Sequence, residues 1–404
     1  MAKPNAAAIS DARKHAFEKL GIPLNNRVIL SLDGGGMRGI LTVQLLKKLE
    51  EIAGIPCYEL FDMVAGTSTG AIIAGLVTTG HSAADIEDKY IKLVTEVFDK
   101  RFLGNRFLNP PAFSKKNYRK LLKGIVNDLT LEQACNLHNV DLMITAQDLS
   151  AAEETFFSCF NQTDGTYYGT YKEVLLRAVM EATMSAPTYF NPLERFVDGG
   201  TTTYNNPSLA AFMEALSYST PSKDRDHSSY SMSALTMFSF GTGISRQFTD
   251  PNKTTGIGVN NLMHWLNWIM TETGQDASAM QVNTFRSKMI GTIIDFRRYQ
   301  ISLDASAISR LPNTDELDEQ KYGTQWLREV SNDILHNIDM ADTSRFDLMK
   351  VIGKQMSQFI VDCGNNFRGD LTEHNRDMLV STYGDIDRIK KQMRDPNWID
   401  SFKH

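Results

Sequence analysis

Two short apolar stretches, each running directly into a glycine-rich turn, constrain the fold of this chain most strongly. The first is RVILSL at residues 27–32, followed by the turn DGGGMRG, and the second is FDMVAG at residues 61–66, which runs into GTSTG. Short apolar runs of this kind are typical of buried β-strands. A helical pattern follows each turn, and the order strand–helix–strand–helix predicts a parallel α/β sheet.

The rest of the chain extends this pattern. We expect further strands at residues 140–149, 155–160, 195–198, 234–243 and 293–303, whereas the pattern from residue 313 onward is almost wholly helical. The predicted fold class is therefore α/β, with a central, mostly parallel sheet between layers of helices and a helical C-terminal extension.

Composition narrows the class of protein. The 404 residues are 42% hydrophobic and 22% charged, which is typical of a soluble globular protein, and the net charge of −6 speaks against a nucleic-acid polymer as partner. No secretory signal is visible at the N-terminus. The most apolar window, at residues 64–80, is short and rich in Gly, Ser and Thr, so we do not expect it to span a membrane. The cysteines show neither CxxC nor metal-ligand spacing, so we expect reduced thiols in a cytoplasmic protein. They are Cys57, Cys135, Cys159 and Cys363.

The turn GTSTG at residues 66–70 fits the pattern G-x-S-x-G. In this pattern a sharp strand-to-helix turn, flanked by small residues, lets the serine project its hydroxyl at the top of the sheet. The positive end of the following helix adds to the site. Ser68 is therefore a candidate nucleophile. The alternative is a turn of small residues that only permits tight strand–helix packing.

The turn GGGMRG at residues 34–39 fits G-x-G-x-x-G and has two explanations. A dinucleotide-binding turn requires an acidic residue at the end of the second strand, but Asp62 stands before that strand. A Walker A loop is excluded because no Gly-Lys-Ser/Thr follows. The second explanation is an oxyanion hole, in which bare N–H groups of consecutive glycines stabilise the charge formed when a serine attacks an ester. Neighbouring strand ends meet at one edge of a parallel sheet, so this loop and Ser68 are expected to converge.

A serine nucleophile needs a base. None of the eight histidines follows a strand at a glycine turn, as a conventional triad would require. Asp198 does: RFVDGG predicts a short strand that ends in this aspartate, followed by two glycines. Within hydrogen-bonding reach of Ser68 it would act as the general base directly. The alternative is an ordinary Asp-Gly turn residue.

DGGGMRG, GTSTG and DGG, in this order and with SAPTYF shortly before the last, resemble the motifs of the patatin-like phospholipases. The resemblance implies a three-layer α/β/α fold, a Ser68–Asp198 dyad without histidine, and an oxyanion hole from the amides of Gly35 and Gly36. It implies that Arg38 holds a substrate phosphate or steadies the loop. The other motif positions are Gly34, Gly39, Gly66, Gly70, Gly199 and Gly200.

The same resemblance implies that the chain hydrolyses acyl esters of glycerolipids and needs neither metal nor cofactor. It implies transient contact with a membrane surface, and some bacterial members of the family are switched on by a partner or a small signal. The implied division is an N-terminal helical lead at residues 1–27, a catalytic domain at 28–207, and a remainder at 208–404 that completes the sheet and carries a mostly helical, regulatory region.

Three alternatives stay open at this stage. They are a nucleotide-binding regulatory protein that uses GGGMRG, an interaction protein with an inactive hydrolase fold, and an acyltransferase that uses the same acyl-enzyme. The segment NLMHWLNWIM at residues 261–270 is predicted to be a buried helix, with an interfacial or acyl-chain surface as the alternative.

Overall fold

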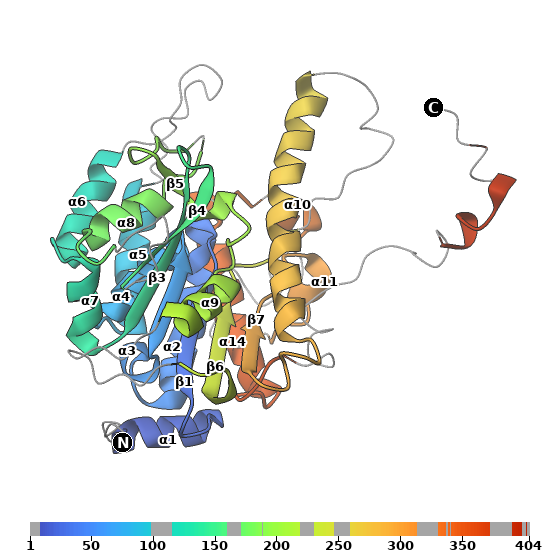
Figure 1. The fold of residues 1–404 in the computed structure, drawn as a ribbon. Helices are drawn as coiled ribbons and strands as arrows, with labels where there is room; N and C mark the ends of the chain where they lie inside the picture. The colour runs from blue at the N-terminus through green and yellow to red at the C-terminus, as the bar shows by residue number, and fades with distance from the viewer. Residues whose placement is uncertain are drawn as a thin grey trace, which may run out of the picture.

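The computed structural model describes residues 9–97, 115–159, 171–187, 189–218, 230–245, 259–312, 330–336, 338–339, 341–371, 390–397 and 401. Within these ranges seven strands form one sheet in the order β4-β3-β2-β1-β6-β7, with β5 beside β3 (Figure 1). The strands are β1 (Arg27–Leu32), β2 (Met63–Thr67), β3 (Asp141–Asp148), β4 (Glu153–Ser158), β5 (Phe196–Asp198), β6 (Leu235–Phe240) and β7 (Asp295–Tyr299). All neighbours pair in parallel except β4 and β5, which run antiparallel to β3. The predicted, mostly parallel sheet is confirmed.

Helices connect the strands and cover both faces of the sheet (Figure 1). They are α1 (Asp11–Leu20), α2 (Gly39–Ala53), α3 (Cys57–Leu60), α4 (Thr69–Thr78), α5 (Ala83–Val97), α6 (Lys115–Val126), α7 (Leu131–His138), α8 (Leu176–Thr183), α9 (Ser208–Tyr218), α10 (Val259–Phe285), α11 (Ala305–Ile308), α13 (Asn332–His336) and α14 (Phe346–Asp362). Short 3-10 turns include η1 (Gly36–Arg38) and η3 (Gly199–Thr201). Among the described helices, none is long and apolar enough to cross a membrane.

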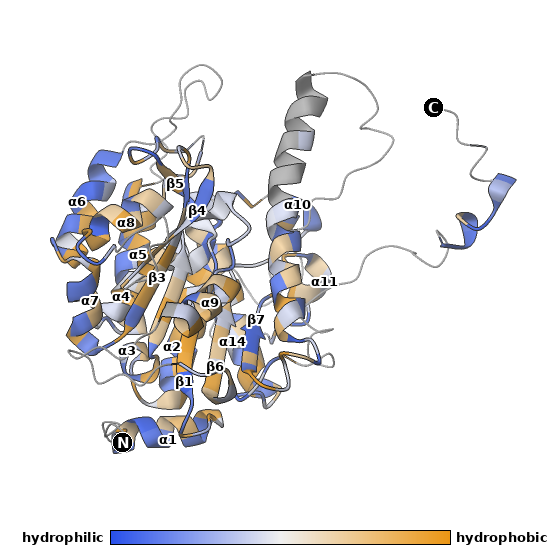
Figure 2. Ribbon diagram, viewed as in Figure 1, coloured by the Kyte–Doolittle hydropathy of each residue, from blue (hydrophilic) through white to orange (hydrophobic). Residues whose placement is uncertain are grey.

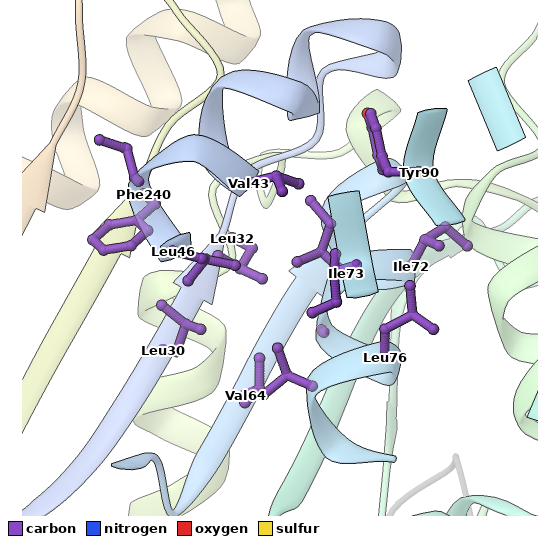
Figure 3. Packing of buried hydrophobic residues seen from close by; sticks show 14 of the residues in the cluster. Leu30, Leu32, Val43, Leu46, Val64, Ile72, Ile73, Leu76, Tyr90 and Phe240 are labelled. Carbon is purple, nitrogen blue, oxygen red and sulfur yellow. The ribbon is translucent and has the colours of Figure 1, made fainter. Parts of the chain in front are cut away.

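Alternation along β1 divides the core between the two faces, because successive strand residues point to opposite sides. Leu30 and Leu32 belong to the cluster that α2, α4, α5 and α14 share, whereas Ile29 belongs to the cluster formed with α9 and α10. Figure 2 shows β1 and β6 as strongly hydrophobic strands, between helices of mixed character, whereas β7 is hydrophilic. Figure 3 shows side chains of the first cluster, among them Leu30, Leu32, Val43, Leu46, Val64, Ile72, Ile73 and Leu76. The sheet thus lies between two helical layers, as expected.

The part of the chain after residue 207 completes this architecture. β6 lies between β1 and β7, and α14 packs against α2. The boundary at residue 207 and a separate regulatory region remain predictions.

Some sequence expectations need correction or fall outside the described residues. The segment at 261–270 is helical as predicted. Trp265 is 37% exposed, so the predicted burial is wrong at this residue. The described residues do not include the other side chains of that segment, Phe160 of the predicted strand at 155–160, or the predicted helical stretches at 313–329 and 372–389.

Candidate active site

The register of β3 brings the two distant motifs together. Thr67, the last residue of β2, pairs with Thr145 of β3, and the next β3 residue, Ala146, pairs with Asp198 of β5. Since β4 occupies the other edge of β3, β5 continues along the edge that β2 leaves. Ser68 and Asp198 therefore meet at the carboxyl end of the sheet.

Ser68 forms the turn between β2 and α4 in a conformation that serine rarely adopts, with φ 52° and ψ −123°. Its Oγ donates a hydrogen bond of 2.6 Å to Oδ2 of Asp198, and its N–H donates one of 2.8 Å to Oγ1 of Thr183. A Cβ at Gly66 would lie 2.5 Å from the carbonyl oxygen of Gly70, so only glycine permits this close strand–helix approach. The local sequence thus presents the serine hydroxyl to the aspartate.

Asp198 is 5% exposed and receives two hydrogen bonds. The second comes from the N–H of Gly200 to Oδ1, at 2.7 Å. Burial raises the pKa of Asp198 to about 6, although the hydrogen bonds from Ser68 and Gly200 oppose the rise. No histidine within the described ranges bonds to Ser68 or Asp198. A buried carboxylate with this pKa is suited to take a proton from a hydroxyl near neutral pH.

The glycine loop lies directly against Ser68. A Cβ at Gly34 would be 3.3 Å from Cβ of Ser68. The N–H of Gly34 donates to the carbonyl oxygen of Asn205 at 3.1 Å, and Oγ1 of Thr242 donates to the carbonyl oxygen of Gly34 at 2.9 Å. A Cβ at Gly35 would lie 2.5 Å from Cβ of Thr242, so this position has no room for a side chain.

Two N–H groups of this loop are available as donors. Within the part of the chain that the structure describes, neither Gly35 nor Gly36 donates a backbone hydrogen bond. Gly36 has φ 57°, a conformation that favours glycine, and its carbonyl oxygen accepts a hydrogen bond from Tyr90. The loop therefore offers two free amides beside the serine, as an oxyanion hole requires.

Arg38 follows at the end of η1 and is partly buried. Burial lowers its pKa, and the negative charge of Asp339 opposes that effect. Its Nε is buried and has no hydrogen-bond partner among the described residues. Both roles suggested for this side chain, holding a phosphate and steadying the loop, remain open.

The remaining motif glycines are places of close packing. A Cβ at Gly70 would lie 2.5 Å from the carbonyl oxygen of Leu32, and one at Gly199 would lie 2.6 Å from that of Thr145. A Cβ at Gly39 would collide with the ring of Tyr90.

Asn205, Thr242 and Tyr90 support the glycine loop but are absent from the sequence-based candidates. Thr242 lies in the stretch SFGTG, two residues after the end of β6. Asn205 and Tyr90 carry no local signal, because their role arises from tertiary contacts.

The structure speaks against a dinucleotide-binding role for the glycine loop, because the acidic residue that this role requires is not near the loop. Asp62 precedes β2, at the opposite end of the strand from Ser68, and its carboxylate is paired with Arg13 at 2.8 Å and Arg27 at 2.6 Å. The four cysteines form no disulfide. In the described residues, no group of His, Cys, Asp and Glu side chains is arranged to hold a metal ion.

Comparison with known proteins finds similarity to one family. Residues 30–212 match the family described as Patatin-like phospholipase. The chain is 31% identical over 254 residues to the 85/88 kDa calcium-independent phospholipase A2 of Mus musculus, a match that covers 59% of this chain and 30% of the mouse protein.

Two bacterial relatives, both called cGAMP-activated phospholipase, are each 32% identical. The match to the protein of Escherichia coli (strain TW11681) covers 46% of this chain and 55% of that protein. The match to the protein of Vibrio cholerae covers 47% of this chain and 58% of that protein. The matches thus span less than two thirds of each relative. The likeness to the patatin-like phospholipases thus lies within residues 30–212 of the chain, where the family model matches.

Proposed function

We propose that this chain hydrolyses acyl esters of glycerolipids and releases fatty acids, with Ser68 as the nucleophile and Asp198 as the general base. The observation that carries the proposal is the 2.6 Å hydrogen bond between Oγ of Ser68 and Oδ2 of Asp198, in a serine held at a strained strand-to-helix turn. The match of residues 30–212 to the patatin-like phospholipase family supports the substrate class.

In the proposed first step, Oγ of Ser68 attacks the ester carbonyl carbon while Asp198 takes its proton. The N–H groups of Gly35 and Gly36 donate to the oxyanion of the tetrahedral intermediate, and each such donor is worth on the order of 10²–10³ in rate. The intermediate collapses, the C–O bond to the glycerol oxygen breaks, and that oxygen leaves with the proton from Asp198. The product is an acyl ester of Ser68.

In the second step, water attacks the acyl ester and gives a proton to Asp198. The same two amides stabilise the second oxyanion. The bond to Oγ of Ser68 breaks, Oγ recovers the proton, and the fatty acid leaves. One carboxylate therefore serves both half-reactions.

The substrate and its surroundings belong to the same proposal. Glycerolipids reside in membranes, so the protein makes transient, peripheral contact with a lipid surface. The positive charge of Arg38 on the loop suits the phosphate of a phospholipid or the fixing of the loop itself.

We also propose a small-molecule activator. Two of the relatives are named as cGAMP-activated phospholipases. A cyclic dinucleotide is therefore the first effector to test. Assays should be run with and without it, because an enzyme without its activator would show low activity.

The test is to incubate the wild-type chain with vesicles of mixed phospholipids and galactolipids, with and without cGAMP, and to measure released fatty acids by mass spectrometry. Release by the wild type and none by Ser68→Ala supports the proposal. Equal release by both variants, or none by the wild type in either condition, contradicts it. Transfer of the acyl group to an alcohol in place of water would identify an acyltransferase.

A further inference from the structure

A row of polar side chains crosses the centre of the sheet on the face that α9 covers. Ser31 of β1 is in register with Ser239 of β6, which is in register with Arg298 of β7. The preceding row on the same face is apolar. It consists of Ile29, Met237 and Phe296. The polar row lies next to the strand ends from which the glycine loop starts.

Arg298 in this row forms a buried, two-pronged ion pair with Asp33. Nη1 donates to Oδ1 at 2.8 Å and Nη2 donates to Oδ2 at 2.5 Å. Nη1 also donates to Oγ of Ser239 at 2.8 Å. The side chains of Arg298 and Asp33 are each 5% exposed. Burying two charges is costly, and such pairs often add no stability over apolar residues of similar size, so stability alone does not account for this one.

Asp33 is the residue that opens the glycine loop. Its N–H donates to the carbonyl oxygen of Phe240 at 3.0 Å, and Gly34 follows directly. If Asp33 shifted, Gly34 and the two amides after it would shift too. The loop is packed closely against the serine, since a Cβ at Gly34 would lie only 3.3 Å from Cβ of Ser68.

The row also connects to the second support of the loop. Oγ of Ser208, at the start of α9, bonds to Oγ of Ser31 at 2.9 Å, to Oγ of Ser239 at 2.8 Å and to Oδ1 of Asn206 at 2.6 Å. The neighbour of Asn206 is Asn205, whose carbonyl oxygen accepts the N–H of Gly34. Through these hydrogen bonds and the peptide link from Asn206 to Asn205, Arg298 is connected to Gly34 as well as to Asp33.

We infer that Arg298 is a positioning residue for the proposed hydrolysis: through its paired hydrogen bonds to Asp33 it fixes the glycine loop against Ser68. Arg298 lies outside residues 30–212, the part that matches the family. The later part of the chain thus helps to build the site as well as the sheet. The consequence for catalysis rests on the proposed function, whereas the fixing of the loop can be measured without it.

The chain offers a matched control in the adjacent residue. Arg297 is also buried, with its side chain 1% exposed, but it belongs to the opposite face of the sheet. It is paired with Asp295, and it donates to the carbonyl oxygens of Leu20 and Phe367 at 2.8 Å and 2.7 Å. None of its described contacts reaches the glycine loop.

The experiment compares Arg298→Lys with Arg297→Lys, both of which keep the charge and lose the two-pronged geometry. We expect both to lower the melting temperature. Only Arg298→Lys is expected to lower kcat and the rate of Ser68 labelling by a fluorophosphonate, on the order of 10²-fold, with KM unchanged, because a misplaced catalytic group costs about that much. Equal kinetic losses in both variants, or wild-type kcat in Arg298→Lys, would overturn the inference.

Amide hydrogen exchange separates this inference from the proposed function. Faster exchange in peptides that cover residues 33–38 of Arg298→Lys, and not of Arg297→Lys, supports the inference even if the wild type releases no fatty acid. Unchanged exchange there overturns it even if the wild type is active. Should Arg298→Lys not fold, Ser239→Ala removes one acceptor of the guanidinium, and it must show a smaller change of the same kind or the inference fails.

Discussion

Ser68 occupies a backbone conformation that costs free energy, with φ 52° and ψ −123°. A non-glycine residue in such a region costs about 1–3 kcal/mol and persists only where the surrounding structure enforces it. Here the enforcement comes from the tight approach of Gly66 to α4 and from the register of β2 and β5 on β3. In this enforced conformation the hydroxyl of Ser68 points toward Asp198.

This strain predicts a difference between two inactive variants. Ser68→Gly and Ser68→Ala both lose the hydroxyl, but only alanine keeps the Cβ that the backbone disfavours. We therefore expect Ser68→Gly to exceed Ser68→Ala in free energy of unfolding by about 1 kcal/mol or more, measured by denaturant titration. Equal stability of the two would show that the turn is not strained.

The pKa of Asp198 predicts the pH dependence of activity. Burial raises it to about 6, and the base must be ionised to accept a proton. We expect kcat/KM to be constant well above pH 6 and to fall about tenfold per pH unit below it. Asp198→Asn should be almost inactive at every pH. A profile governed by a group with a pKa far from 6 would contradict the assignment.

Sequence motifs indicated Ser68 and Asp198 because each motif is a local chain geometry: a strand, a turn and small neighbours. They could not indicate Asn205, Thr242 or Arg298, since these reach the loop only through strand register and through the start of α9. Their residue types are common in loops and strands, so no local pattern distinguishes them.

The glycine turns act at the scale of the strand–helix units. A Cβ at Gly66 would lie 2.5 Å from the carbonyl oxygen of Gly70 and 2.6 Å from the backbone of Ala71, and neither can move without moving α4. We predict that Gly66→Ala lowers the free energy of unfolding by about 1–3 kcal/mol, as overpacking does. Unfolding in denaturant measures it.

Gly124 in α6 is the control, because a Cβ there meets nothing within 4 Å. Gly124→Ala should raise the free energy of unfolding by about 0.5–1 kcal/mol, through helix propensity. If Gly66→Ala and Gly124→Ala change the free energy of unfolding in the same direction, the close approach at Gly66 does not determine stability.

Elements with strong apolar patterns were predictable, whereas those defined by partners were not. The helix α8 begins only at Leu176, because residues 172–175 run beside α7. The N–H of Leu131 donates to the carbonyl oxygen of Val174, and that of Glu132 donates to the carbonyl oxygen of Lys172. The helix α7 itself has a signal that the sequence analysis missed, the capping box between Thr130 and Gln133.

At the scale of the whole molecule, a partly buried charge cluster links three helices of one layer. Glu87 of α5 is paired with Lys47 of α2 and, at 2.9 Å, with Lys350 of α14, and it accepts a hydrogen bond from Gln44 at 2.9 Å. Burial raises the pKa of Glu87, but these partners more than offset it and bring the pKa down to about 2. The helix α14 is thereby linked to the layer that covers the sheet.

The cluster predicts how stability depends on pH. The folded-state pKa of Glu87 is below its ordinary value of 4.5, so its contribution is complete above about pH 4.5 and is lost as the pH falls toward 2. We expect Glu87→Gln to lower the melting temperature at pH 7 and to flatten its dependence on pH between about 4.5 and 2. Parallel curves for the two proteins would contradict this.

Two strands of the sheet, β6 and β7, lie beyond the residues that match the family model. The match ends at residue 212, yet β6 and β7 complete the sheet beside β1 and carry residues that hold the glycine loop. The sequence predicted both strands from their apolar runs, but strand order and the polar row follow from parallel pairing across distant segments.

The most direct test of the central claim, that Asp198 activates Ser68 without a histidine, is the rate at which a fluorophosphonate labels the intact protein, with the site mapped by mass spectrometry. The account predicts labelling of the wild type at Ser68, and labelling of Asp198→Asn that is slower by orders of magnitude although the variant is folded. Labelling at another residue, or an equal rate in Asp198→Asn, would contradict it.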